Sequence, residues 1–421
     1  MPPHSHGSDT DVAPPSAEGV GLRRRAVWLM LLFLVPVGLA TVIGLIVLWP
    51  GDGPTKAEQA AATYLPPGTT YPQGRVVSVE TAPCSADASA PAGTCGTAVV
   101  EVRDGEGAGD FQQIDLPPDV VAAGVEKGDT LVLTRDGGAE GGATYQFSDY
   151  ARGTPVIVLA VLFAVVVGAV ARLRGLASLV GLAFAFAVLL WFLLPGLLSD
   201  HSPMLISLVG SSAIMFVVLY LSHGFSARTT TALVGTLFGL ALVAVLGSVA
   251  VGVARLTGLT SEETTTLHNY DPALNFSGLV LAGVVVAGLG VLNDVTITQA
   301  SAVWQLREAS PEMTWRELFG RGMAVGRDHI ASTVYTIVFA YAGASLPLLL
   351  LFELYHQPFW TVLTSSAVAE EVIRTLVGSI ALVLAVPVTT AVGALVAKAA
   401  ETEAGVATER RMTALRARFA R

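Results

Sequence analysis

The stretch FSGLVLAGVVVAGLGVLNDVTITQAS, residues 276–301, decides the fold class of this chain. Its first 17 residues carry no charge, so they are nearly long enough to cross a bilayer as a helix. Asn293 and Asp294 follow directly, and Thr298 continues the polar run. A helix apolar enough for lipid therefore leads into a carboxylate. If that carboxylate lies inside the protein, the chain is expected to be a membrane conduit. If it does not, the chain is expected to be only a membrane anchor.

The whole chain has the composition of a membrane protein. Of its 421 residues, 52% are hydrophobic and 14% are charged, whereas soluble domains have about 25% charged residues. Uncharged apolar windows of about 18 residues indicate transmembrane helices, and we expect about eight here. The fold class predicted is an all-α polytopic membrane bundle with a small β domain between helices one and two. The expected spans are Ala26–Trp49, Pro155–Val170, Leu176–Leu194, Met204–Leu221, Thr231–Val253, Phe276–Trp304, Ile330–Phe352 and Val372–Val396.

Composition also divides the chain into segments. Residues 1–25 are rich in Pro, Gly and Ser and are expected to form a disordered cytoplasmic tail. Residues 26–49 form the first transmembrane helix, and residues 50–150 form an extracytoplasmic β-rich domain. Residues 151–400 form a seven-helix membrane domain, and residues 401–421 form a basic cytoplasmic tail.

The polar segment 50–150 contains five short β-branched runs separated by turn residues. The runs are GRVVSVETA, TAVVEVR, FQQIDL, TLVLTR and TYQFS. They predict five strands of a small barrel of the OB type or a sandwich. Cys84 and Cys95 flank one turn, and if this domain is exported they are expected to form a disulfide, with two reduced thiols as the alternative.

Basic residues predict the orientation. Arg23–Arg25 precede the first span, and most other Lys and Arg residues fall in alternate loops and in the C-terminal tail. By the positive-inside rule, both termini are then cytoplasmic and the β domain is exported.

Motifs of other protein classes do not occur in the sequence. It contains no CxxC pair, HExxH, GxxxxGK[ST] or GxSxG. We therefore expect no enzyme, no cofactor and no metal, and the net charge of −9 gives no reason to expect nucleic acid. The expected partners are the lipid bilayer and an unknown small solute or ion, and a homo-oligomer is an open alternative.

Three polar clusters are candidates for a transport path. In residues 276–301, helical spacing places one stripe of small and polar residues on one face, and small residues let a neighbouring helix approach closely. A carboxylate there is expected to face protein or water, although a solvated position at the headgroups is the alternative. The stripe and its polar neighbour are Gly283, Ala287, Gly290, Asn293, Asp294, Thr298 and Ser301.

The second cluster, Asp328, His329 and Ser332, begins the next predicted helix. With Asp294 it could form a proton or cation site, whereas ordinary helix N-terminal chemistry is the alternative. The third cluster is Glu370, Glu371 and Arg374. Either carboxylate can pair with the arginine along a helix, which would suit an external gate.

Two further features concern packing and a cavity. Gly235 and Gly239 form a GxxxG motif, which predicts a close helix contact. Pro387 is expected to interrupt the last helix, and Thr389 beside it could then line a cavity, although a simple kink is the alternative.

Residues 222–240, 279–301, 326–350 and 370–392 together resemble the YibE/F family of bacterial multi-pass membrane proteins, over roughly residues 150–396. The family's glycine-rich run into an aspartate is matched by Gly288, Gly290 and Asp294, and its Gly-Arg/Lys-Asp motif by Gly326–Asp328. Residues 335–337 read Tyr-Thr-Ile where the family often has Asn before Thr-Leu. The resemblance implies a bacterial cytoplasmic-membrane protein of essentially unknown function, for which permease or efflux activity is a conjecture.

Two functional hypotheses follow. The first is an ion- or proton-coupled transporter, permease or channel, with a polar site at Asp294, Asp328 and His329 and a mouth at Glu370, Glu371 and Arg374. The second is a membrane scaffold or sensor that does not transport and that binds a partner or ligand through its exported β domain.

Overall fold

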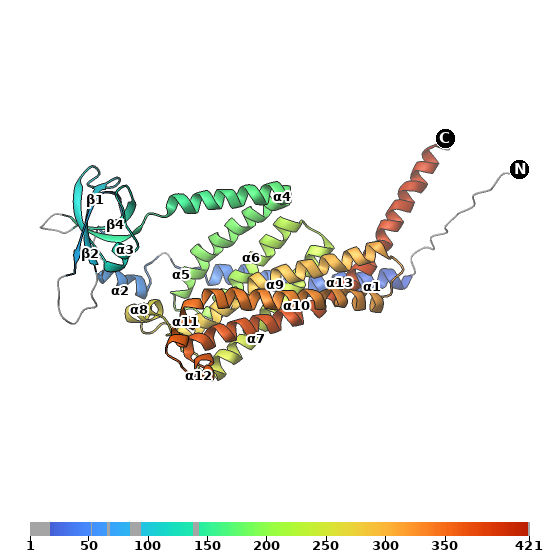
Figure 1. The fold of residues 1–421 in the computed structure, drawn as a ribbon. Coiled ribbons are helices and arrows are strands. Elements are labelled where there is room, and N and C mark those ends of the chain that lie inside the picture. Colours follow the sequence, from blue (N-terminus) through green and yellow to red (C-terminus); the bar gives the residue numbers. More distant parts are fainter. Residues whose placement is uncertain (1–16, 52, 65–67, 85–93, 138–142, 420–421) are drawn as a thin grey trace, which may run out of the picture. The chain divides into compact units, whose positions relative to one another are not determined.

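The computed structural model describes residues 17–51, 53–64, 68–84, 94–137 and 143–419. The chain divides into two compact units. One consists of Met1–Gly53 with Leu173–Arg421 and is helical; the other is Pro54–Arg172 and contains the β-sheet (Figure 1). Each unit has its own apolar core.

The β unit is a five-stranded antiparallel sheet with strand order β3-β2-β1-β4-β5. The strands are β1 (Gln73–Pro83), β2 (Thr94–Val102), β3 (Phe111–Leu116), β4 (Thr130–Asp136) and β5 (Thr144–Tyr150). All five predicted strands are confirmed. The two end strands, β3 and β5, contact each other, so the sheet is nearly closed. The unit also contains two short helices, α2 (Lys56–Tyr64) and α3 (Pro118–Ala122), and residues 153–172 of the long helix that follows β5.

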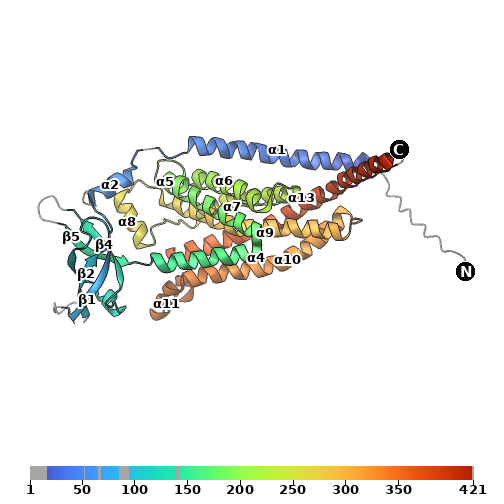
Figure 2. The same ribbon diagram turned by 90° about the horizontal axis from the view of Figure 1, so that it is seen from above.

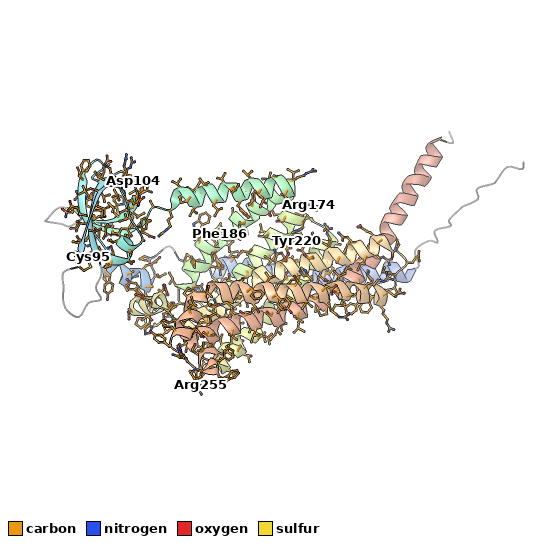
Figure 3. The ribbon with its side chains drawn as sticks, viewed as in Figure 1. Cys95, Asp104, Arg174, Phe186, Tyr220 and Arg255 are labelled. Carbon is orange, nitrogen blue, oxygen red and sulfur yellow. A yellow bond between two sulfur atoms is a disulfide. The ribbon has the colours of Figure 1, made fainter. Side chains whose placement is uncertain are left out.

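Alternating side chains make the core of the sheet. Alternate residues of β2 and β4 are buried, as expected for strands with one face inside a barrel. The most buried apolar residues are Val76, Ala98, Val100, Val102, Ile114, Leu116, Leu131 and Leu133. Cys84 and Cys95 are joined by a disulfide, with Cys95 on β2 (Figure 3).

The helical unit is built from long apolar helices connected by short ones. Its elements are α1 (Ala17–Val47), α4 (Gly153–Val188, beyond Arg172), the π-helix η1 (Leu189–Leu193), α5 (Leu194–Leu197), α6 (Pro203–His223), α7 (Ala227–Val253), α8 (Glu262–Tyr270), α9 (Phe276–Ala309), α10 (Trp315–Ala344), α11 (Leu346–Leu354), α12 (Phe359–Leu363) and α13 (Ser366–Phe419). α8, α11 and α12 lie at one end of this unit, here called the α8 end (Figure 1).

Local sequence signals determine several helix starts. The Ser226 side chain accepts a hydrogen bond from the Thr229 amide at the start of α7, and Asn275 does the same for Gly278 at the start of α9. Thr314 and Glu317 form a reciprocal capping box at the start of α10. These caps satisfy amide groups that have no partner within the helix.

Among the described residues, six helices are long and apolar enough to cross a membrane, or seven if α10 and α11 count as one bent span. The prediction of about eight counted Pro155–Val170 and Leu176–Leu194 separately, whereas the count of six takes Gly153–Leu197, 45 residues, as one stretch. That stretch is two helices joined across a kink, and the kink lies between the two predicted spans. That stretch leaves helical geometry at Arg172, with φ 53° and ψ −136°. The break is also where the β unit ends.

Two other features differ from the predictions: the start of α1 and the course of the last helix at Pro387. α1 begins at Ala17, so residues 17–25 are helical rather than part of a disordered tail; residues 1–16 lie outside the described residues. α13 continues through Pro387 without a break in its helical assignment. Neighbouring helices can compensate for the missing proline N–H in a membrane helix.

The centre of the helical unit is formed by α7, α9 and α13, which pack on one another. One apolar cluster joins them to α1, η1 and α6, and a second joins them to α10. Seen from above, α1 runs along one side of the bundle and α10 along the other (Figure 2). Large apolar side chains on the outer faces of the helices are exposed, as expected for surfaces that contact lipid.

A candidate polar path along α9, α10 and α13

The centre of the bundle contains a layer of buried hydroxyl and amide groups. Gln299 on α9 is 2% exposed and donates through Nε2 to the Gly322 carbonyl at 2.7 Å and to Thr390 Oγ1 at 2.8 Å. These bonds join α9 to α10 and α13. Thr296 on α9 lies 2.6 Å from Thr236 on α7, oxygen to oxygen. The layer thus connects four helices through polar groups that are paired with each other.

The two glycines of the GxxxG motif pack against this central layer. A Cβ at Gly235 would meet the Thr389 side chain on α13 and lie 3.3 Å from Thr296 Cγ2. A Cβ at Gly239 would lie 2.5 Å from Leu292 Cδ2. Thr389 itself is fully buried, and its hydroxyl donates to the Ala385 carbonyl at 2.8 Å. Thr389 therefore takes part in helix packing.

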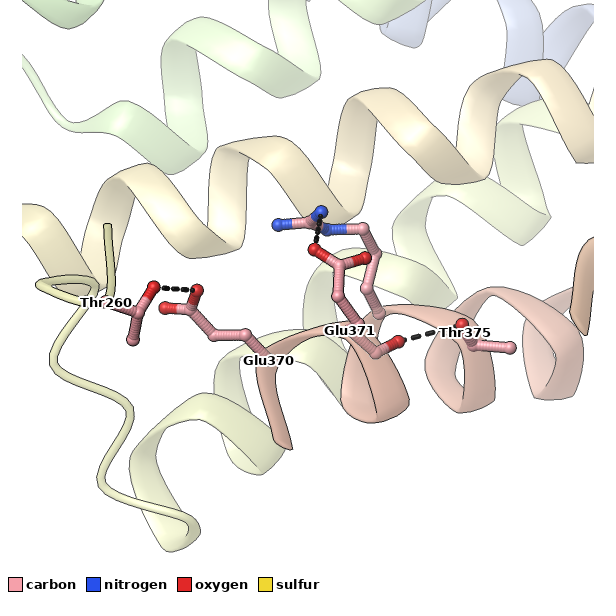
Figure 4. Close-up of polar contacts among 5 residues, drawn as sticks. Thr260, Glu370, Glu371 and Thr375 are labelled. Atoms are coloured by element: carbon pink, nitrogen blue, oxygen red, sulfur yellow. Dashed lines mark hydrogen bonds and ion pairs between the residues drawn. The ribbon is translucent and has the colours of Figure 1, made fainter. Parts of the chain in front are cut away.

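The α8 end holds a cluster of ionisable groups near the start of α13 (Figure 4). Arg374 Nη1 donates to Glu371 Oε1 at 2.6 Å. Thr260, in the segment before α8, donates to Glu370 Oε2 at 2.9 Å. Of the two predicted pairings, the structure has the one with Glu371, so Glu370 is held by a hydroxyl instead.

This cluster draws on helices that are far apart in sequence. The Arg374 guanidinium lies 3.7 Å from where a Cβ of Gly283 on α9 would be. Tyr341 on α10 is close enough to Arg374 and Glu371 to interact with their charges. Sequence reasoning missed both Thr260 and Tyr341, because neither belongs to a motif and Thr260 is 110 positions from Glu370.

The stripe on α9 lies differently from what was expected. Asp294, Thr298 and Gly290 are all exposed, and no described atom lies within 4 Å of a Cβ at Gly290. Gly290 is therefore not a packing position within this chain, and Asp294 does not face the packed interior, so Asp294 by itself gives no support to a conduit. The adjacent Asn293 is half-buried, and its buried Oδ1 accepts no hydrogen bond from the residues that the structure describes.

The predicted site at Asp294, Asp328 and His329 is not joined by direct contacts. Asp328 and Ser332 on α10 are exposed, and His329 is half-buried with its Nε2 atom buried and unpaired. Across the described part of the chain, no hydrogen bond or ion pair links these three ionisable residues. The described residues also contain no group of three or more His, Cys, Asp or Glu side chains that could hold a metal ion.

Among the described residues, four buried polar atoms on three adjacent helices have no hydrogen-bond partner. They are Asn293 Oδ1 on α9, His329 Nε2 on α10, and Glu370 Oε1 and Arg374 Nε on α13. α9, α10 and α13 pack on one another. Buried polar atoms in proteins are nearly always paired, and in a membrane the unpaired state is costly. Each of these atoms could therefore take part in one further hydrogen bond.

Comparison with known proteins gives one match. The family model described as YibE/F-like protein matches residues 159–399, which is more than half of the chain and includes every residue of the three polar clusters. The search of curated proteins and the search of solved structures found no match.

Proposed function

Because the chain belongs to the YibE/F-like family, whose matched region contains the polar path, we propose that it is an ion- or proton-coupled transporter, permease or channel of the bacterial cytoplasmic membrane. Its apolar helices indicate a membrane protein. The observation that carries the proposal is the set of four unpaired, buried polar atoms on α9, α10 and α13. An anchor has no need of such atoms, since each raises the free energy of the folded state.

In this proposal the path runs between α9, α10 and α13. The Glu371–Arg374 pair lies near its α8 end, where separation of the pair would open the entrance. Asn293 and His329 line its middle, and the exposed face with Asp294, Thr298 and Asp328 is its water-facing wall. The buried layer at Gln299 and Thr390 joins the same three helices and so keeps their spacing fixed.

The orientation in the proposal is the one that the basic residues indicate. Both termini face the cytoplasm, and the β unit with its disulfide is exported, where disulfides persist. We assign the β unit to the OB type. The strand order β3-β2-β1-β4-β5, the contact between β3 and β5, and the position of α3 between β3 and β4 support this assignment.

The rival function is a membrane scaffold or sensor whose β unit binds a partner. The compactness of the β unit favours it, since residues 54–172 form a unit with their own core. Deleting the β strands separates the two functions: a scaffold loses its phenotype, whereas a transporter retains charge movement through the helices.

The proposal is tested by electrical recording on protein reconstituted in liposomes. Jumps in H⁺, Na⁺ or K⁺ concentration over a solid-supported membrane should displace charge in the wild-type protein. The Arg374→Gln variant should lose most of this signal, because it leaves Glu371 and Glu370 without a cation near the entrance. Arg316→Gln, at an exposed position at the start of α10, is the matched control. Currents no larger than those of protein-free liposomes for all three ions would refute the proposal.

A further inference from the structure

Three basic residues from three helices gather at the end of the helical unit opposite the α8 end. Arg174 lies at the start of the second half of α4, His223 ends α6, and Arg228 lies in the first turn of α7. Arg174 and Arg228 are both close enough to His223 for their charges to act on it. In Figure 3, Arg174 is labelled above Tyr220, which lies one turn before His223 on α6. These three residues are here called the basic patch.

The basic patch has no acidic residue on its own helices. The sequence contains no Asp or Glu between Asp149 and Asp200, and none between Asp200 and Glu262, so α4, α6 and α7 contribute none. The ion pairs seen among the described residues belong to other arginines. Because an arginine side chain keeps its charge in proteins, the patch carries two positive charges that no carboxylate of this chain neutralises.

The basic patch lies where the chain leaves the membrane. The apolar helices on either side of it, Pro203–His223 and Ala227–Val253, are both long enough to cross a bilayer, so the short turn between them lies at the membrane surface. Arg174 follows the break in α4 at Arg172. An arginine within the hydrocarbon is costly, and its side chain extends toward the headgroups when it is near a helix end. The two guanidinium groups are therefore at the level of the lipid phosphates.

Exposed apolar side chains lie beside these charges. Phe225, in the turn between α6 and α7, is 89% exposed and stacks on Tyr220 with ring centroids 4.6 Å apart. Leu173, next to Arg174, is 81% exposed. A surface that combines cations with exposed apolar groups fits a lipid, whose phosphate meets the cations and whose acyl chains meet the apolar groups. A small soluble anion would leave Phe225 and Leu173 without a partner.

We propose that the basic patch binds the phosphate group of an anionic phospholipid in the leaflet at this end of the bundle. Arg174 and Arg228 donate to the phosphate oxygens, and Phe225 lies against the acyl chains. The N-terminal end of α7 adds a partial positive charge that favours the same group. Each arginine at a membrane surface strengthens binding of anionic lipid by about fivefold. This site is separate from the proposed transport path and does not depend on it.

Fluorescence quenching at one position tests the proposal on the full-length protein in nanodiscs. The two native cysteines are joined in a disulfide, so a cysteine introduced at exposed Ala227 can be labelled alone with bimane. Phosphatidylglycerol and phosphatidylcholine with the same acyl chains are mixed, and either one or the other is brominated close to its headgroup. Brominated phosphatidylglycerol should quench this label more strongly, with a relative binding constant above one and up to about 25 from two arginines.

Glutamine variants of the labelled protein locate the site. Arg174→Gln and Arg228→Gln should each lower the preference for phosphatidylglycerol by about fivefold. Arg255→Gln, just beyond the other end of α7, makes the same change in charge and should leave the preference unchanged. Arg228→Lys keeps the charge and should keep most of the preference, which separates loss of the ligand from a folding defect.

Three results would overturn the proposal. They are equal quenching by the two brominated lipids, an unchanged preference when Arg174 and Arg228 are both replaced by glutamine, and an equal loss in Arg255→Gln. Loss of the preference on addition of sodium phosphate, but not of sodium chloride at the same ionic strength, would assign the patch to free phosphate and would also overturn it. None of these outcomes depends on whether the liposome currents are seen.

Discussion

The two faces of α9 carry similar residues but have different surroundings. One face holds Leu292, Thr296 and Gln299, all buried against α7, α10 and α13. The other holds Gly290, Asp294 and Thr298, all exposed. Both faces have small or polar residues at helical spacing. Small residues in a membrane helix therefore indicate close packing only where a partner helix is present.

The two faces of α9 also differ in whether their polar groups have hydrogen-bond partners. The amide and hydroxyl groups on the buried face bond to other helices or to their own backbone. Among the described residues, the Asp294 carboxylate on the open face has no such partner, and its side chain is exposed. The buried face is thus suited to hold the bundle together, and the open face to meet water or a second molecule.

A pair of glycine substitutions, one on each side of this contrast, should give the largest difference in stability. In Gly235→Ala the new methyl group collides with Thr389, and the resulting overpacking should destabilise the protein by about 1–3 kcal/mol. Gly290→Ala has open space and should be neutral or stabilising by up to about 1 kcal/mol, because alanine favours the helix. The midpoint of SDS-induced unfolding, followed by circular dichroism, measures both. Equal losses would mean that the two faces are packed alike.

The hydrogen bonds of Gln299 should give the next largest effect. Gln299→Met keeps the side-chain volume but removes the bonds to the Gly322 carbonyl and Thr390, at an expected loss of about 1 kcal/mol. Thr298→Val, one position away on the open face, should change stability by less than about 0.5 kcal/mol. The same unfolding measurement applies. A larger loss in Thr298→Val would show that the open face is covered by a partner.

The contact between Thr236 and Thr296 should be weaker still. Thr236→Val, Thr296→Val and the double variant form a thermodynamic cycle, with an expected coupling of about 0.6 kcal/mol. The coupling is small because each hydroxyl also bonds to its own helix, Thr236 to the Ala232 carbonyl and Thr296 to the Leu292 carbonyl. A coupling near zero would mean that these backbone bonds alone satisfy the hydroxyls.

Local patterns explain what could be predicted from sequence. The strands of the β unit were found because alternation along a strand is a local property, and the apolar helices were found because bilayer thickness sets their length. The family was recognised from the order of short motifs along the sequence, and the match over residues 159–399 confirms it.

Contacts between distant residues explain what could not be predicted. Spacing along α9 placed Gly290 and Asp294 on one face, but only α7, α10 and α13 decide which face is inside. Spacing along α13 allowed Arg374 to pair with either glutamate, and Thr260, from a separate segment, holds the other one. The helical start of α1 at Ala17 likewise leaves no clear composition signal.

Cysteine labelling can show whether the open face of α9 contacts water or lipid. Of the substitutions considered, those used for this labelling should change stability least. Asp294→Cys and Thr298→Cys should each change stability by less than about 0.5 kcal/mol, because both positions are exposed. The background is silent, since Cys84 and Cys95 are the only cysteines and are joined to each other. A thiol reacts with maleimide as the thiolate, which forms in water and not in lipid. Both variants should therefore be labelled by a membrane-impermeant maleimide, whereas Thr296→Cys on the buried face should not. Protection of the cysteines at 294 and 298 would place this face against lipid or a second copy, and would remove Asp294 from the proposed path.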